Sequence, residues 1–148
     1  MVLAHTDLFQ LDKEVMQRVN CLSHLAKRFI FMLEVKEISI LLINLFQQVA
    51  GTVETIIVTK GGGGCDILTA SGTVEIPVVP ADDAVDPTGA GDAFRGGLIK
   101  GIVEGKSMER AVQMGNVAGH YAVRKWGTQQ YSFTMDEFNG LLEKHFGQ

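Results

Sequence analysis

The chain has 148 residues, of which 46% are hydrophobic and 20% are charged, and its formal net charge is -4. This length suits one compact domain with its own core. The acidic balance and the scattered Lys and Arg residues argue against a nucleic-acid partner, which requires a basic surface.

The N-terminus, the most apolar run and the cysteines predict the cellular compartment of the protein. Residues 1–7 lack the basic and apolar regions of a signal peptide. The most apolar run, Ile38–Phe46, is shorter than the roughly 20 residues of a membrane span. Cys21 and Cys65 have neither CxxC spacing nor a nearby Cys/His cluster, which predicts no zinc site. We expect a cytoplasmic protein with free thiols and no membrane contact, although a disulfide between the two cysteines remains an alternative.

The first third of the chain predicts apolar helices and carries no chemical motif. Apolar side chains between Phe9 and Phe29 recur every three to four residues, which indicates a helix. Residues 28–33 could form a short strand, and residues 39–50 a second helix that ends before Gly51. Short apolar runs do not separate strand from helix, so both alternatives stay open in this segment.

The middle of the chain predicts three successive strands joined by short turns. Residues 53–59 are almost all β-branched and run into four glycines at 61–64. Residues 65–69 would return as a second strand. A turn at 70–72 leads to a third strand over 73–79, bent at Pro77. The simplest arrangement is a β-meander.

Three helices follow in the last part of the chain. Small and apolar residues predict a buried helix over 89–104. Ser107 is a suitable cap for the next helix, and Thr134 with Glu137 has the spacing of a capping box for a last helix that ends near Phe146. Glycine costs about 1 kcal/mol against alanine inside a helix, so the glycines of the first two helices predict very close packing.

The most informative segment is the loop from Val85 to Phe94, which reads Val-Asp-Pro-Thr-Gly-Ala-Gly-Asp-Ala-Phe. It leads directly into a helix, whose first turn leaves backbone N–H groups free to bind an anion. Asp92 would stand beside this site, where a carboxylate is unfavourable unless it has a task such as accepting a proton from an attacking hydroxyl. The structural alternative is a glycine turn with an aspartate at a helix N-terminus.

This run, continued by residues 93–97, resembles the C-terminal signature of the PfkB carbohydrate kinases, a family that includes ribokinase, fructokinase and adenosine kinase. The Asp-Pro-Thr variant followed by Phe-Arg is most similar to bacterial adenosine-kinase-like members. The resemblance implies an α/β, ribokinase-like fold: the C-terminal part of a Rossmann-like three-layer sandwich, with a mostly parallel sheet and a small β-meander. Within one compact domain, it separates a poorly matched segment, residues 1–50, from an ATP-binding and catalytic region, residues 51–148.

The resemblance also implies the roles of the loop residues. Gly89, Ala90 and Gly91 would form the anion hole for the transferred phosphate. Asp92 would be the base that activates the substrate hydroxyl. The implied ligands are ATP, Mg²⁺ and a sugar or nucleoside, and the implied reaction is phosphoryl transfer to an alcohol group.

Residues outside the loop match the family's nucleotide site. Thr59, Gly61 and Gly64 correspond to a Thr-x-Gly-x-x-Gly turn along the ATP phosphates, and Asn116 falls where members line the adenine pocket. Alternatively, the glycines serve only a hairpin turn, and Asn116 is an amide on a helix surface. Lys60 is expected to be a solvated side chain.

A further group matches the place where many members bind a monovalent cation, K⁺ in this interpretation: Asp86, Thr88 and Gly127. For His120, packing or exposure is a simpler expectation than catalysis. Trp126 is expected to fill a core position rather than to offer a stacking surface.

The resemblance leaves one part of the family unmatched. Members are longer, and the half that supplies their sugar-binding residues and lid has no counterpart here; nor is the family's Asn-x-x-Glu motif found. Two alternatives to a kinase therefore stay open: a truncated, non-catalytic nucleotide-binding module, and an assembly subunit of kinase ancestry. A half-domain would expose a sheet edge and an apolar face, which predicts self-association or pairing with a complementing chain.

Overall fold

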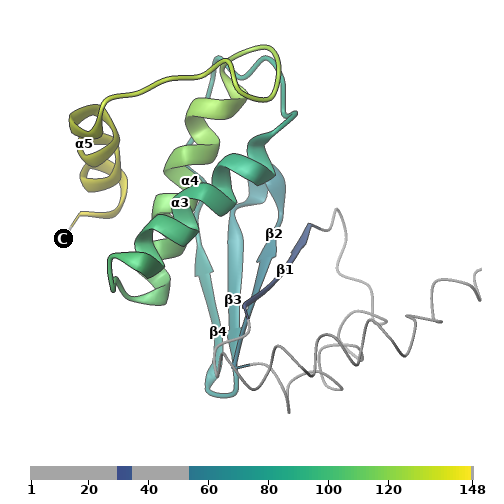
Figure 1. Cartoon of the computed structure of the whole chain (residues 1–148). Helices are drawn as coiled ribbons and strands as arrows, with labels where there is room; N and C mark the ends of the chain where they lie inside the picture. The colour runs from purple at the N-terminus through teal and green to yellow at the C-terminus, as the bar shows by residue number, and fades with distance from the viewer. Residues whose placement is uncertain (1–29, 35–53, 148) are drawn as a thin grey trace, which may run out of the picture.

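The computed structural model describes residues 30–34 and 54–147 of the chain. One sheet contains four strands in chain order: β1 (Ile30–Glu34), β2 (Thr55–Thr59), β3 (Cys65–Thr69) and β4 (Gly72–Ile76). Three α-helices follow: α3 (Ala90–Val103), α4 (Met108–Val123) and α5 (Met135–Phe146). Figure 1 shows α3 and α4 lying across one face of the sheet, with α5 beside them.

The predicted β-meander is confirmed, because β2, β3 and β4 pair antiparallel in sequence order. The prediction of a mostly parallel sheet is wrong for the described strands, since only β1 and β2 pair parallel. The physical reason is connection length: short turns join antiparallel neighbours, whereas a parallel pair needs a long crossover. The last strand ends at Ile76 and does not continue through Pro77, which has no N–H for a strand ladder.

The strand predicted near residues 28–33 is present as β1, Ile30–Glu34. The helices predicted between Phe9 and Phe29 and over residues 39–50 lie outside the described residues. The three later helices are found where expected. Ser107 accepts a hydrogen bond from the Arg110 backbone N–H, and Thr134 forms a complete capping box with Glu137. Within the described ranges, no helix is both long and apolar enough to cross a membrane.

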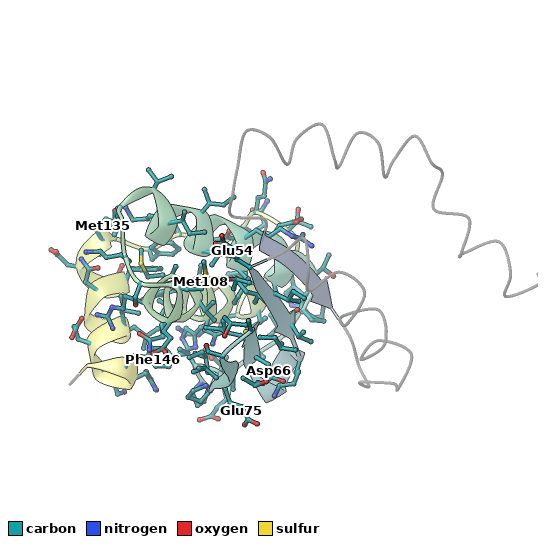
Figure 2. All side chains as sticks on the ribbon, turned by 90° about the horizontal axis from the view of Figure 1, so that it is seen from below. Glu54, Asp66, Glu75, Met108, Met135 and Phe146 are labelled. Carbon is teal, nitrogen blue, oxygen red and sulfur yellow. The ribbon has the colours of Figure 1, made fainter. Side chains whose placement is uncertain are left out.

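One face of the meander packs against α3 and α4. Cys65, Ile67 and Ile76 project from β3 and β4 toward Phe94 and Leu98 of α3, and all of these side chains are buried. The alternation of strand side chains places them on one face. A second cluster joins α4 to α5, whose ends are marked by Met135 and Phe146 in Figure 2.

The predicted close packing of the two central helices is confirmed. A Cβ atom added at Gly97 would lie 2.4 Å from the Met114 carbonyl oxygen, and one at Gly101 would lie 2.7 Å from the Ala111 Cα. These approaches require glycine, and they explain why residues that weaken an isolated helix occur in α3. The close contact fixes the position of the N-terminus of α3 above the sheet.

Candidate active site

The loop before α3 is held by the carboxylate of Asp86. Its two oxygens accept hydrogen bonds from the backbone N–H groups of Thr88 and Gly127, each at 2.9 Å. Interaction with the Thr88 side chain, and then with these two N–H groups, lowers the pKa of Asp86. Asp86 therefore ties the loop to the turn after α4, and the three residues predicted to bind a cation lie together.

The backbone of the loop requires glycine at one position. Gly89 is the N-cap of α3 with φ +83°, and an added Cβ would lie 2.9 Å from the Thr128 backbone. The Ala90 N–H donates to the Pro87 carbonyl at 3.1 Å, so this amide already has a partner. The N–H groups of Gly91 and Asp92, in the first turn, have no acceptor within the helix. Within the predicted anion hole, the Gly91 amide is thus free of a partner in the helix, whereas the Ala90 amide is engaged.

Asp92 is also in the first turn of α3, as the sequence predicts. Its side chain is 79% exposed, and it accepts from Arg95 Nη1 at 2.6 Å. An exposed ion pair of this kind contributes little to stability. The carboxylate is therefore accessible to solvent and close to a cationic group, and it contributes little to the stability of the fold.

The glycine-rich turn between β2 and β3 is internally hydrogen-bonded. Lys60 N–H donates to the Gly64 carbonyl at 2.8 Å, and Gly64 N–H donates to the Gly61 carbonyl at 3.1 Å. Gly64 has φ +84°, and its added Cβ would lie 2.4 Å from the Ile76 carbonyl oxygen. These glycines do form the predicted hairpin turn, and the Gly64 backbone also lies close to the end of β4.

Lys60 differs from its prediction as a solvated side chain. Its ammonium lies 2.6 Å from the Asp66 carboxylate, whose side chain is 10% exposed. The hydrogen bond to Asp66 raises the pKa of Lys60. Asp66 in turn pairs across the strands with Glu75 (Figure 2), so Lys60 is held by an acidic neighbourhood on β3 and β4.

A cavity of about 590 Å³ opens between the glycine turn, the N-terminus of α3 and the face of α4. Its walls include most of the predicted site residues: Thr59, Gly61, Gly64, Asp86, Ala90, Gly91 and Asn116. Gly89, Thr88, Asp92 and Gly127 do not line it, although Asp92 directly follows Gly91. A cavity of this volume, with mainly apolar walls and a few polar groups, is typical of a pocket for a small organic ligand.

Asn116 is buried on α4, with 7% of its surface exposed, so the alternative of a helix-surface amide is wrong. Its Nδ2 donates to the Pro77 carbonyl at 2.9 Å, and its Oδ1 lies 3.2 Å from the Cys65 thiol, which donates. Burial raises the pKa of Cys65 to about 12. The thiol therefore keeps its proton, and it is a polar group of the pocket that the sequence did not single out.

His120 lines the same cavity one turn beyond Asn116. Arg124 Nη1 lies 3.4 Å from His120 Nε2, and Arg124 Nε binds both oxygens of Asp83 at 2.8 Å. Burial lowers the pKa of His120. Arg124 can only donate, so Nε2 is the acceptor of this contact, while hydrogen bonding with the backbone of Pro80 and Val79 acts against burial and raises the pKa.

One further prediction can be compared with the structure. Trp126 is 73% exposed, so its prediction as a core side chain is wrong. Trp126 lies in the turn after α4, beside Gly127, whose backbone N–H donates to Asp86, and its burial depends on tertiary packing that the sequence pattern does not contain. In the part of the chain that is described, no three His, Cys, Asp or Glu side chains gather as a metal site.

Comparison with known proteins identifies related sequences. The family model of the pfkB family carbohydrate kinases matches residues 30–134. A nucleoside kinase of Methanocaldococcus jannaschii is 38% identical over 93 residues, which cover 63% of this chain and 31% of that protein. An inositol 3-kinase of Arabidopsis thaliana is 40% identical over 80 residues, covering 54% of this chain and 22% of the relative. The matched segments thus cover less than a third of the length of these relatives.

Solved structures show the same fold. A Burkholderia thailandensis nucleoside kinase in complex with inosine is 31% identical, with a TM-score of 0.77 over 97% of this chain and 46% of that chain. An Escherichia coli protein described as a putative ribokinase II, in complex with ATP and Mg²⁺, is 26% identical, with a TM-score of 0.70 over 90% of this chain and 44% of that chain. The predicted α/β, ribokinase-like fold is confirmed, and the chain belongs to the pfkB family of carbohydrate kinases.

Proposed function

We propose that this chain supplies the ATP site and the catalytic base of a phosphotransferase that acts on a hydroxyl group of a nucleoside or sugar. The observation that carries the proposal is the cavity itself. It brings the glycine turn at Gly61–Gly64, the loop at Ala90–Gly91 and Asn116 together, although they lie far apart in the sequence. Residues 51–148 would then act as the ATP-binding and catalytic region.

The nucleotide would bind with its phosphates toward the glycine turn and the N-terminus of α3. Thr59, Gly61 and Gly64 line one side of the cavity, and the amide of Gly91 and the helix dipole act on the other. The adenine ring of the nucleotide would reach Asn116, which lines the cavity from α4. Such binding places the transferred phosphate next to Asp92.

Asp92 would accept the proton of the attacking hydroxyl. Its exposure and its position after Gly91 leave room for an alcohol to approach. Phosphoryl transfer depends mainly on positioning and on stabilising charge, and Gly89–Gly91 would serve this purpose as the anion hole. The positively charged Arg95, three residues further along α3, lies beside the Asp92 carboxylate.

ATP would be accompanied by Mg²⁺, as in the Escherichia coli relative whose structure contains both. Asp86, Thr88 and Gly127 would support a monovalent cation beside the loop, with K⁺ as the expected ion. Their hydrogen bonds already gather one carboxylate and two backbone segments at this place. We expect this chemistry in the cytoplasm, where the free thiol of buried Cys65 is stable.

The base assignment is tested with Asp92→Asn. We expect phosphate transfer from ATP to a panel of nucleosides, ribose and inositol to fall by about 10²- to 10⁴-fold, because a positioned base contributes this much. The affinity for ATP should change less than about twofold, since the mutation keeps the shape and removes a charge that repels phosphate. Asp136→Asn is the matched control, because Asp136 is an exposed carboxylate in the first turn of α5.

Loss of ATP affinity equal to the loss of transfer would contradict a role in chemistry. Gly89→Asp tests the phosphate position separately, because its side chain meets the Thr128 backbone and adds negative charge at the loop. Gly96→Asp adds the same charge on α3 where there is open space, and should leave ATP affinity unchanged.

The second candidate is a nucleotide-binding module without catalysis, or an assembly subunit of kinase ancestry. The chain matches less than half of the length of these kinase relatives, and this observation supports the second candidate. Saturable ATP binding without transfer to any acceptor would support the module, and absence of nucleotide binding would support the assembly subunit. In either case we expect self-association or pairing with a complementing chain.

A further inference from the structure

The turn between β2 and β3 forms one wall of the cavity, and its own residues do little to hold it in one conformation. Residues 61–64 are all glycine, and Gly61, Gly62 and Gly64 line the cavity. Glycine has more backbone freedom than any other residue, so ordering a run of glycines costs more conformational entropy. A turn that meets its ligand in one conformation therefore needs an anchor outside the glycines.

Lys60, at the start of this turn, is bonded to it twice through its backbone. Its N–H donates to the Gly64 carbonyl at 2.8 Å, and its carbonyl accepts from the Gly63 N–H at 3.0 Å. A group that fixes the position of Lys60 therefore also restricts the two glycines at the far end of the turn.

The side chain of Lys60 is held from behind the turn. Its ammonium donates to Asp66 Oδ1 at 2.6 Å, and the two side chains are only 28% and 10% exposed. Strand side chains alternate, so Asp66 projects from the face of β3 opposite to Cys65 and Ile67, which pack toward α3. Neither Lys60 nor Asp66 lines the cavity, so the pair supports the turn without occupying the place of a ligand.

The low exposure of this pair makes it a firmer anchor than a surface ion pair. A hydrogen bond between an ammonium and a carboxylate is stronger than a neutral one, and water and salt screen a partly buried pair less. Without Lys60, the buried carboxylate of Asp66 would lose the cation that compensates its charge. Lys60 is therefore kept in one position.

We propose that Asp66 is a positioning residue, which anchors Lys60 and thereby keeps the glycine turn in the conformation that receives the phosphates of the nucleotide. This inference rests on the proposed nucleotide site and adds the contact that shapes it. A preorganised turn raises affinity because less conformational entropy is lost on binding. Lys60 then acts through its position and not by attracting phosphate with its charge.

The test is Asp66→Asn in the full chain, because the two possible roles of the pair predict changes of opposite sign. Asparagine keeps the shape of the side chain but removes the charge that strengthens the bond. If Lys60 acted by its charge, loss of the opposing carboxylate would raise the affinity for ATP. For an anchor, we expect calorimetric titration with ATP and Mg²⁺ to show an affinity about three- to tenfold lower, the effect of ordering roughly one more residue on binding.

Glu75→Gln is the matched control. Glu75 is exposed and lies opposite Asp66 in the register of β3 and β4. This variant removes the same charge from the same neighbourhood and keeps the bond between Lys60 and Asp66. Its affinity for ATP should equal that of the parent or rise slightly. A rise in both variants, or an equal fall in both, would overturn the inference.

Melting temperatures measured beside the affinities separate positioning from stability. A lower melting temperature of Asp66→Asn with unchanged ATP affinity would show a structural role alone; it would overturn the inference and leave the proposed function intact. If the parent chain does not bind ATP, the proposed function fails and the inference with it.

A second variant covers the case in which Asp66→Asn does not fold. Lys60→Met combined with Asp66→Leu replaces the pair by apolar side chains, a change that is often neutral for stability. It also keeps the net charge, so a role of charge alone predicts little change in ATP affinity. We expect the same three- to tenfold fall, to about the affinity of a chain with a loose turn, and an unchanged affinity would overturn the inference.

Discussion

At the scale of single residues, we expect protonation of His120, on the wall of the pocket, to make the stability of the protein depend on pH. Its ring lies on the cavity wall beside Arg124, which itself binds Asp83. Burial is the main cause that lowers the pKa of His120, and the Arg124 charge acts in the same direction. The folded protein therefore takes up this proton less readily than the unfolded chain does.

This shift has a definite sign for stability. Above the unfolded pKa of about 6.5 the histidine is neutral in both states and adds no pH dependence. As the pH falls from about 6.5 toward the lowered folded pKa, the unfolded chain binds the proton first and stability decreases. Thermal melts at pH 7.5 and 5.5 should show a smaller decrease in melting temperature for His120→Gln than for the parent. His145→Gln, at an exposed position on α5, should behave like the parent, and equal decreases in all three would contradict the prediction.

At the scale of elements, the contact between α3 and α4 depends on glycine at chosen positions. Gly96 and Gly97 are neighbours on α3, but only Gly97 faces the Met114 backbone. A Cβ at Gly96 meets nothing within 4 Å. The two positions therefore form a matched pair in which composition is the same and packing differs.

We expect Gly97→Ala to lower the free energy of unfolding by about 1–3 kcal/mol, because the methyl group would force the helices apart. Gly96→Ala should raise it by about 0.5–1 kcal/mol, since alanine favours an exposed helix position. Urea unfolding of both variants measures the difference. Similar values for the two would contradict the close contact between α3 and α4 at Gly97.

At the scale of the whole molecule, the described part of the chain presents sheet edges and exposed apolar side chains. The chain spans 46% of the Burkholderia thailandensis nucleoside kinase chain. Within the described strands, β1 and β4 are the two edges of the sheet. Ile99 and Val103 lie one turn apart on α3 and are 58% and 81% exposed. Unpaired strand edges and exposed apolar side chains favour association.

Sedimentation experiments at micromolar concentrations should therefore show dimers or larger species that dissociate on dilution. The association should persist in 0.5 M salt, because screening weakens contacts between charges and leaves apolar contacts and strand pairing intact. A monomer at every concentration would contradict this prediction. Loss of association in salt alone would instead indicate a contact between charged surfaces.

Local sequence rules predicted the elements that local chemistry controls. The glycine turn at Gly61–Gly64, the capping box at Thr134 and the helix that begins after Gly89 each depend on neighbouring residues, and each is found as expected. The residues of the Asp86–Asp92 loop were recognisable for the same reason: their order along the chain already specifies a turn, a helix start and a carboxylate. The sequence by itself thus determined the motifs and the family.

Only the tertiary structure decided which of these residues meet. Burial of Asn116, exposure of Trp126 and the ion pair of Lys60 with Asp66 depend on which surfaces pack together, and periodicity along one helix or strand does not contain that information. The bond between Cys65 and Asn116 joins positions 51 residues apart. It exists because β3 and α4 pack on each other, and this long-range packing gives the pocket its polar groups.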